Sequence, residues 1–154
     1  MGDMQIVAFG LNNELCGVDT SDVQEIIKYR DVVKVENMPE FIDGVIDYRG
    51  VMVPVINLNK RFEFGDTQVT KKTKLIIVKA NEILLGFIVN DVMEIIKLTE
   101  QDFEPAPDIV RLEGNVYLKC VAKVRDELVS VIDPALVLKD EELKKLEALE
   151  NTTD

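Results

Sequence analysis

Five carboxylates at regular spacing are the first feature of the sequence that could support chemistry. Asp19, Asp22 and Glu25 follow one another at intervals of three residues, and Asp91 and Glu94 repeat the last part of this pattern. Paired carboxylates can act as general acid and base, or they can bind a hard cation. The same spacing also suits the ends of a short helical turn, where acidic side chains cap the turn and remain solvated.

The residues that usually complete a catalytic or metal site are missing. The chain has no histidine, which removes the commonest general base, the commonest metal ligand and any Ser-His-Asp or Cys-His arrangement. Glycine-rich phosphate loops and the spacing of a calcium loop are absent from the sequence as well. We therefore interpret the carboxylates as capping and solvated groups, and we expect no catalytic residues, no metal and no cofactor.

The two cysteines, Cys16 and Cys120, each lie in an apolar run typical of a strand. A free cysteine behaves as a small hydrophobic residue, which favours two buried thiols. A disulfide between them is the alternative, and a metal site made of two thiols so far apart in sequence is disfavoured.

The amino-acid composition limits the kinds of molecule that the chain could bind. The chain has 154 residues, of which 47% are hydrophobic, and its 29 acidic and 18 basic residues give a formal net charge of −11. Nucleic acids and anionic membranes need clustered positive charge, so both are disfavoured, whereas a protein partner is not. The sequence shows no secretory signal and no apolar run of the roughly 20 residues that a membrane span needs. We expect a cytoplasmic protein without direct membrane insertion.

The segment from residue 38 to 62 predicts a β-hairpin. Two runs rich in valine and isoleucine, Gly44–Tyr48 and Val51–Ile56, are joined by Arg49 and Gly50. Gly50 can supply the positive φ of a tight turn, which would place Arg49 at the tip. Pro54 lies inside the second run and lacks a main-chain N–H, which predicts an edge strand or a bulge there.

The chain also contains an internal duplication. Residues 15–28 align with residues 84–97, and eight of the fourteen positions are identical. Residues 53–57 match residues 129–133 in the same way. These matches predict two copies of one β unit, a first repeat over about residues 5–66 and a second over 74–138, with a polar linker over 67–74. A C-terminal helix and tail would occupy residues 139–154.

Each repeat is expected to consist of short strands. The first begins with strands at Gln5–Leu11 and Glu14–Val18, followed by a short helical turn that Ser21 and Gln24 would close as a capping box, and by a strand at Glu25–Tyr29. Residues 104–108 contain two prolines and predict a loop, Asp133 and Pro134 begin a helical turn, and residues 151–154 are expected to fray. Many short strands indicate two small barrels or a sandwich, with a seam between the copies.

A resemblance to a known family rests on the hairpin segment. Its sequence from Phe41 to Leu58 is FIDGVIDYRGVMVPVINL, which resembles the signature of the bacterial chemotaxis coupling proteins, the CheW family. Asp47-Tyr48 replaces the usual Asn-Leu and Asn57 the usual Asp, but Gly44, Arg49, Gly50 and Pro54 are in place. The resemblance extends from Gln5 to about Leu138.

This resemblance implies a mainly β fold of two pseudo-symmetric five-stranded SH3-like barrels with a groove between them, few short helices and a C-terminal helix. It also implies a non-enzymatic adaptor that joins the cytoplasmic tips of methyl-accepting chemoreceptors to the regulatory domain of the histidine kinase CheA, without a fused receiver domain. The family positions implicated in receptor contact correspond here to Val23, Glu25, Gly44, Arg49, Gly50, Gly86, Val92 and Ile95.

Other interpretations remain open at this point. For Val23, Val92 and Ile95, packing in the core is the alternative to receptor contact, and for Arg49 it is a solvated turn charge. A specialised family member could serve a receptor array outside flagellar motility. A small β-barrel enzyme or ligand-binding protein would require a titratable cluster inside the groove. RNA binding conflicts with the negative charge and with the scarcity of exposed aromatic candidates.

Overall fold

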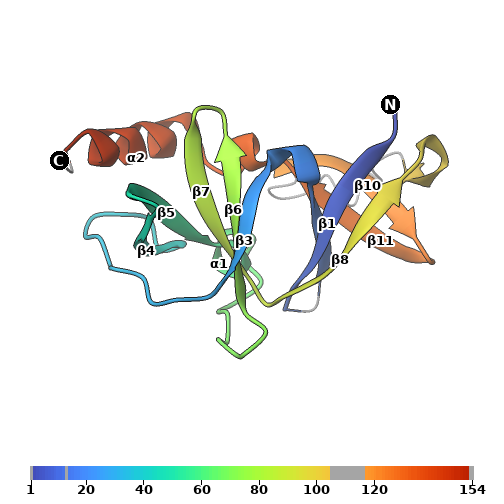
Figure 1. The fold of residues 1–154 in the computed structure, drawn as a ribbon, viewed down its shortest axis with the longest axis horizontal. Coiled ribbons are helices and arrows are strands. Elements are labelled where there is room, and N and C mark those ends of the chain that lie inside the picture. The colour runs from blue at the N-terminus through green and yellow to red at the C-terminus, as the bar shows by residue number, and fades with distance from the viewer. Residues whose placement is uncertain (1, 13, 105–116, 153–154) are drawn as a thin grey trace.

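The protein is built mainly from β-strands in two sheets (Figure 1). The computed structural model describes residues 2–12, 14–104 and 117–152. One sheet has six strands in the order β8 (Asp91–Leu98), β1 (Met4–Leu11), β2 (Glu14–Asp19), β11 (Glu127–Ile132), β10 (Leu118–Val124) and β9 (Phe103–Glu104). The other has five in the order β3 (Val23–Lys28), β6 (Lys74–Ala80), β7 (Ile83–Val89), β5 (Val51–Asn57) and β4 (Ile42–Tyr48).

Each sheet takes strands from both predicted repeats. The strand β3 leaves the first repeat to pair with β6, and β8 leaves the second repeat to pair with β1. Antiparallel pairs dominate, and the two parallel pairs, β2 with β11 and β5 with β7, are equivalent under the duplication. Gly17 lies opposite Val131 in one pair, and Gly86 lies opposite Val55 in the other. The repeats and the sheets therefore do not coincide.

The hairpin predicted over residues 44–56 is present as β4 and β5. Arg49 has φ 52° and Gly50 has φ 84°, which matches a tight turn whose twist suits a hairpin. Of the two alternatives predicted at Pro54, the edge strand was wrong, because β5 lies between β4 and β7. A register shift, as expected for a bulge, lies nearby in the paired strand, between Ile42 and Gly44. Val45, opposite Pro54, exchanges both main-chain hydrogen bonds with Val33 instead. The nitrogen of Pro54 therefore faces away from β4, and pairing with β7 begins one residue later, at Val55.

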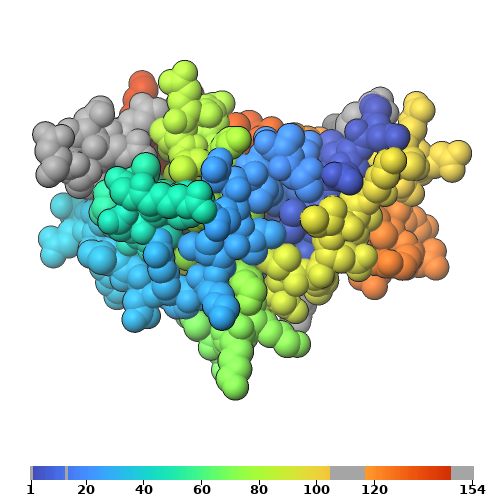
Figure 2. All heavy atoms as spheres, in the orientation of Figure 1, coloured from blue at the N-terminus to red at the C-terminus, as the bar shows by residue number. Residues whose placement is uncertain are grey.

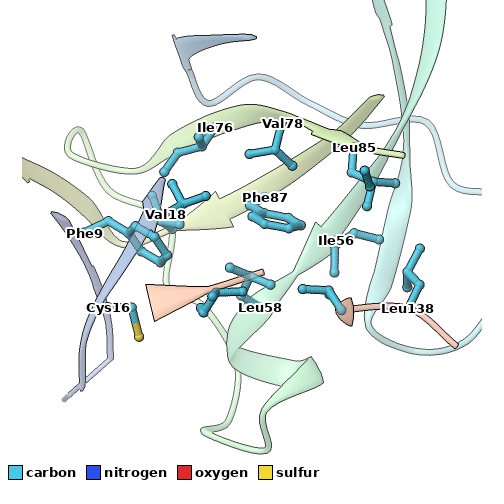
Figure 3. Close-up of a cluster of buried hydrophobic side chains, with 14 of the residues drawn as sticks. Phe9, Cys16, Val18, Ile56, Leu58, Ile76, Val78, Leu85, Phe87 and Leu138 are labelled. Atoms are coloured by element: carbon cyan, nitrogen blue, oxygen red, sulfur yellow. The ribbon is translucent and has the colours of Figure 1, made fainter. Parts of the chain in front are cut away.

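The largest core cluster joins the two sheets (Figure 3). Phe9 and Val18 enter it from the six-stranded sheet, and Ile76, Leu85 and Phe87 enter it from the five-stranded sheet. All five side chains are fully buried. Because apolar burial contributes roughly 25 cal/mol per Å², this shared cluster ties the two sheets together. Two smaller clusters lie within the separate sheets.

The helices are short, and three of those described lie where the sequence predicts a helical turn or the C-terminal helix. The C-terminal helix is α2 (Asp140–Thr152), which continues through residues expected to fray, and α1 (Leu58–Arg61) follows β5. The described residues also contain three 3-10 turns: η1 (Thr20–Asp22), η2 (Glu100–Asp102) and η5 (Pro134–Leu136). Within the described residues no helix is both long enough and apolar enough to cross a membrane.

Two local predictions need correction. The cap of η1 is Asp19, whose side chain accepts a hydrogen bond from the main-chain nitrogen of Ser21, so the predicted capping box at Ser21 was wrong. The strand β3 also begins at Val23 rather than Glu25. Asp133 does cap the turn that begins at Pro134, as predicted. Glu104 ends β9, and the rest of the predicted loop over residues 104–108 lies outside the described residues.

Candidate functional site

The hairpin tip carries a polar cluster that joins β4 to β3. The guanidinium of Arg49 lies 2.8 Å from Oε1 of Glu25, and the hydroxyl of Tyr48 donates a hydrogen bond to the same oxygen. Arg49 also lies over the ring of Tyr48, 5.3 Å from its centroid. The side chain of Arg49 is 69% exposed and that of Glu25 is 35% exposed. An arginine held in place by an exposed ion pair can exchange its carboxylate for one on a partner at little cost.

The electrostatics of this cluster follow from its contacts. The hydrogen bond to Glu25 raises the pKa of the Tyr48 hydroxyl, and burial raises it further. The main-chain nitrogen of Gly50 donates to the carboxylate of Asp47 at 2.9 Å, which fixes the turn. The cluster borders a hollow of about 550 Å³, which we call the first hollow. Its charged lining consists of Lys28, Arg30, Arg49 and Glu25, so cations outnumber carboxylates.

The strands β3 and β8 lie on the same face of the molecule, where Figure 2 shows both segments at the surface. Val23 and Val92 are partly buried against the core cluster that joins the sheets. Ile95 is 63% exposed and Met93 is 55% exposed. Core packing is therefore only a partial account of Val23 and Val92, and it does not apply to Ile95.

The two buried glycines of the predicted site differ in what they allow. Gly44 has φ 151°, and a Cβ atom there would lie 2.2 Å from the main-chain oxygen of Val33. At Gly86 a Cβ atom would meet its nearest neighbours at ordinary contact distances of 3.6–3.7 Å. Gly44 is thus required by the close approach of two chain segments, whereas Gly86 has space for a methyl group.

Most of the chain matches a known domain family. The family model described as the CheW-like domain matches residues 5–142. The chain belongs to the CheW-like domain family. The chemotaxis protein CheW of Klebsiella aerogenes is 30% identical over 139 residues, which cover 90% of this chain and 84% of that protein. The chemotaxis protein CheW of Bacillus subtilis is 30% identical over 137 residues, which cover 89% and 88%.

A solved structure agrees with these sequence matches. The scaffolding protein TtCheW from Thermoanaerobacter tengcongensis superposes with a TM-score of 0.83 at 34% identity, covering 92% of this chain and 91% of that one. The mainly β fold predicted from the sequence, with few helices and a C-terminal helix, is confirmed by this match and by the two sheets.

In this CheW-like domain four of the five carboxylates that could have supported chemistry have structural partners. Asp19 caps η1, and Asp19 and Asp22 lie 3.6 and 3.1 Å from the ammonium of Lys119. Burial lowers the pKa of Lys119, but the hydrogen bond and charge of Asp22, with the charge of Asp19, outweigh it and raise the pKa overall. Glu94 pairs with Arg125 at 2.7 Å. Across the described ranges no three His, Cys, Asp or Glu side chains are grouped as metal ligands.

The cysteines are both free, so the alternative of a disulfide was wrong. Cys16 is buried, and burial raises the pKa of its thiol to about 12, with a smaller contribution from Glu14. Cys120 is only partly buried, which corrects the expectation of two buried thiols. Neither thiol has the lowered pKa of a reactive cysteine.

The structure brings some of the eight predicted residues together and separates others. Arg49, Gly50 and Glu25 meet at the hairpin tip, while the remaining positions lie along β3 and β8 or inside the five-stranded sheet: Val23, Val92, Ile95, Gly44 and Gly86. Sequence reasoning missed Tyr48 and Met93. Tyr48 stands where the family usually has leucine, and this departure was the available signal for a specific hydrogen bond.

Proposed function

We propose that this chain is a non-enzymatic adaptor that couples methyl-accepting chemoreceptors to the histidine kinase CheA. The observation that carries the proposal is the exposed, ion-paired Arg49 at the hairpin tip of a chain that belongs to the CheW-like family. The relatives named as chemotaxis proteins and the scaffolding protein TtCheW support the same role. The adaptor would work in the cytoplasm, at the receptor array on the inner face of the membrane.

The receptor tip would contact the face formed by the hairpin tip, β3 and β8. Glu25, Arg49 and Gly50 supply its polar part, and Val23, Val92 and Ile95 supply its apolar part. An apolar strip with a polar rim suits an amphipathic helix, whose apolar side chains dock while its charges meet the rim. Gly44 and Gly86 are buried in the five-stranded sheet, so they would act by keeping β4 and β7 in place.

Arg49 is the residue on which receptor affinity should depend most. An exposed pair such as Arg49–Glu25 contributes about 0–1 kcal/mol to stability. A carboxylate on the receptor could therefore replace Glu25 as the partner of Arg49 without unfolding the hairpin. The cations Lys28 and Arg30 beside it favour an acidic helix edge.

The kinase contact would use another part of the surface, with the regulatory domain of CheA packing against one sheet through strand edges and apolar side chains. Holding receptor and kinase on one molecule raises their effective concentration, and it allows the state of the receptor to bias the state of the kinase. This mechanism needs no turnover and no cofactor.

Calorimetric titration against a receptor-tip fragment and against the CheA regulatory domain tests the proposal. The chain supplies a matched control for Arg49→Ala, because Arg125 has nearly the same φ, 49° against 52°, and the same kind of ion pair. We expect Arg49→Ala to weaken binding of the receptor tip by about tenfold, with Arg125→Ala unchanged and both variants folded. Equal binding by wild type and Arg49→Ala would refute the receptor role, and failure to bind either fragment would refute the adaptor.

A further inference from the structure

The ion pair at the hairpin tip has a counterpart in the other sheet. The alignment of the repeats relates Glu25 to Glu94 and Arg49 to Arg125. Arg125 occupies the tip of the β10–β11 hairpin, and its guanidinium lies 2.7 Å from the carboxylate of Glu94 on β8. In both sheets the glutamate lies next to a register shift, and the arginine has a positive φ. The duplication has therefore preserved a three-dimensional arrangement, and not only a sequence motif.

This second arrangement also borders a hollow, of about 370 Å³, which we call the second hollow. Main chain and apolar side chains form part of its lining, with contributions from Ala8, Gly10, Leu15, Ile96 and Val124. Its charged lining consists of Glu14, Glu94, Glu127 and Arg125, so carboxylates outnumber cations. The first hollow has the opposite balance, with three cations and one carboxylate. Both hollows are lined by a Glu–Arg ion pair at a hairpin tip, and they differ in the sign of the net charge of their lining.

The second hollow also has an exposed apolar side chain in its lining. Met93 lines the hollow and is 55% exposed. β8 is an edge strand of its sheet in the described part of the chain. An exposed methionine beside fixed charges offers a partner both apolar and polar contacts.

We propose that the second hollow docks a protein segment that presents a lysine or arginine beside apolar side chains. The cation would meet Glu14 and Glu127 at the rim, and the apolar side chains would cover Met93 and the floor of the hollow. A segment with an acidic edge would be repelled here and attracted to the first hollow. The inverted charge thus allows one small protein to hold two different partners on two similar sites without exchanging them.

The charge of the chain argues against a second copy of the protein as the occupant. At a net charge of −11 two copies repel one another, and a rim of carboxylates would face another acidic surface. A basic partner gains from the same charge, and its association rate should fall as salt is added. The inference is independent of the receptor role, because no residue assigned to the proposed receptor face lines the second hollow, and the two sites have only the strand β8 in common.

The test uses two synthetic helical peptides against the full-length protein, one of leucine and lysine and the other of leucine and glutamate in the same pattern. Binding is measured by titration calorimetry at low and high salt, and the site is located by amide chemical shifts. The variant is Glu14→Lys with Glu127→Lys, which leaves the Arg125–Glu94 pair intact. The matched control is Glu36→Lys with Glu40→Lys, two exposed residues whose replacement changes the net charge by the same amount.

We expect the lysine peptide to bind and to shift the amides of Met93, Glu94 and Arg125. The rim variant should weaken this binding by about tenfold, and the control variant by no more than about twofold. Equal weakening by both variants would mean attraction to the whole acidic chain and would overturn the proposal. Equal binding of the two peptides, or shifts confined to other strands, would overturn it too. A concentration-dependent dimer in sedimentation, abolished by the rim variant, would replace the basic partner by a second copy.

Discussion

Replacing Gly44 by alanine should damage the fold at one defined place. The φ of 151° at Gly44 belongs to a region that residues with a side chain rarely adopt, and the new methyl carbon would lie 2.2 Å from the oxygen and 2.7 Å from the carbonyl carbon of Val33. Both of these atoms are main chain, so they cannot be moved by rotating a side chain. The segment that contains Val33 must therefore leave β4.

The expected loss of stability can be estimated from two effects. A residue forced into such a backbone conformation costs about 1–3 kcal/mol. Displacing Val33 also breaks its two hydrogen bonds with Val45, of 2.8 and 2.9 Å, at about 0.5–1.5 kcal/mol each. Relief of the clash limits how far the two effects add, so we expect the free energy of unfolding to fall by about 3 kcal/mol. That is a large part of the roughly 5–15 kcal/mol that stabilises a typical domain.

Urea unfolding followed by circular dichroism measures this loss, with Gly86→Ala as the matched control. Gly86 is a buried strand glycine in the same sheet, and it has space for a methyl group, so its replacement should change the free energy of unfolding by less than about 1 kcal/mol. Equal unfolding midpoints for the two variants would refute the reasoning. If Gly44→Ala lost receptor binding at unchanged stability, Gly44 would have to contact the receptor directly.

Three further changes test other parts of the structure. Gly50 and Asp126 are equivalent turn residues with positive φ. Gly50→Asp should lower the melting temperature by about 2–4 °C, and Asp126→Gly should raise it by about the same amount. Shifts of the same sign would contradict this expectation. Alkylation of the native protein at about pH 8, followed by mass spectrometry, compares the reactivity of the two thiols. Cys120 should react faster than Cys16, because burial raises the pKa of Cys16 to about 12. Equal rates would count against the burial of Cys16. A hydrogen bond to a neighbouring carboxylate, together with burial, raises the pKa of Tyr48 in the folded state. The protonated hydroxyl therefore stabilises the fold fully below the usual tyrosine pKa of about 10, and this stabilisation is lost as the pH rises through the pKa of the folded state. Tyr48→Phe should therefore reduce the loss of unfolding free energy at alkaline pH, measured by denaturant titration. If this free energy falls with pH as steeply as in the wild type, ionisation of Tyr48 is not the cause of the loss.

The sequence predicts what depends on neighbours along the chain. The hairpin around Arg49 follows from β-branched runs and a glycine turn, and the cap at Asp133 follows from a short polar side chain before a proline. Both are present. The capping box at Ser21 failed because Asp19, two residues earlier, accepts the same kind of main-chain hydrogen bond. Local patterns therefore identify the turn correctly and leave its cap ambiguous.

The sequence does not predict which strands pair across the repeats. The pairing of β3 with β6 depends on contacts between segments some 50 residues apart, for which a local pattern contains no signal. The sequence could not choose between an edge strand and a bulge at Pro54 for the same reason, since the place of this residue in the sheet is set by β7. The contact between Glu25 and Arg49 is also invisible in the sequence, although the resemblance had placed both residues in one site.

The connection between the two sheets has a consequence for the two proposed binding sites. β3 carries Glu25 of the first site but is hydrogen-bonded to the second repeat, and β8 carries Glu94 of the second site but is hydrogen-bonded to the first repeat. The ion pair of each proposed site lies within one sheet, so moving one site relative to the other would open the core cluster between the sheets, in which Phe9 and Phe87 are fully buried. This change costs several kcal/mol, because it exposes large apolar side chains. The two proposed sites are therefore held at a fixed separation, and two partners bound to them would be held in a fixed geometry.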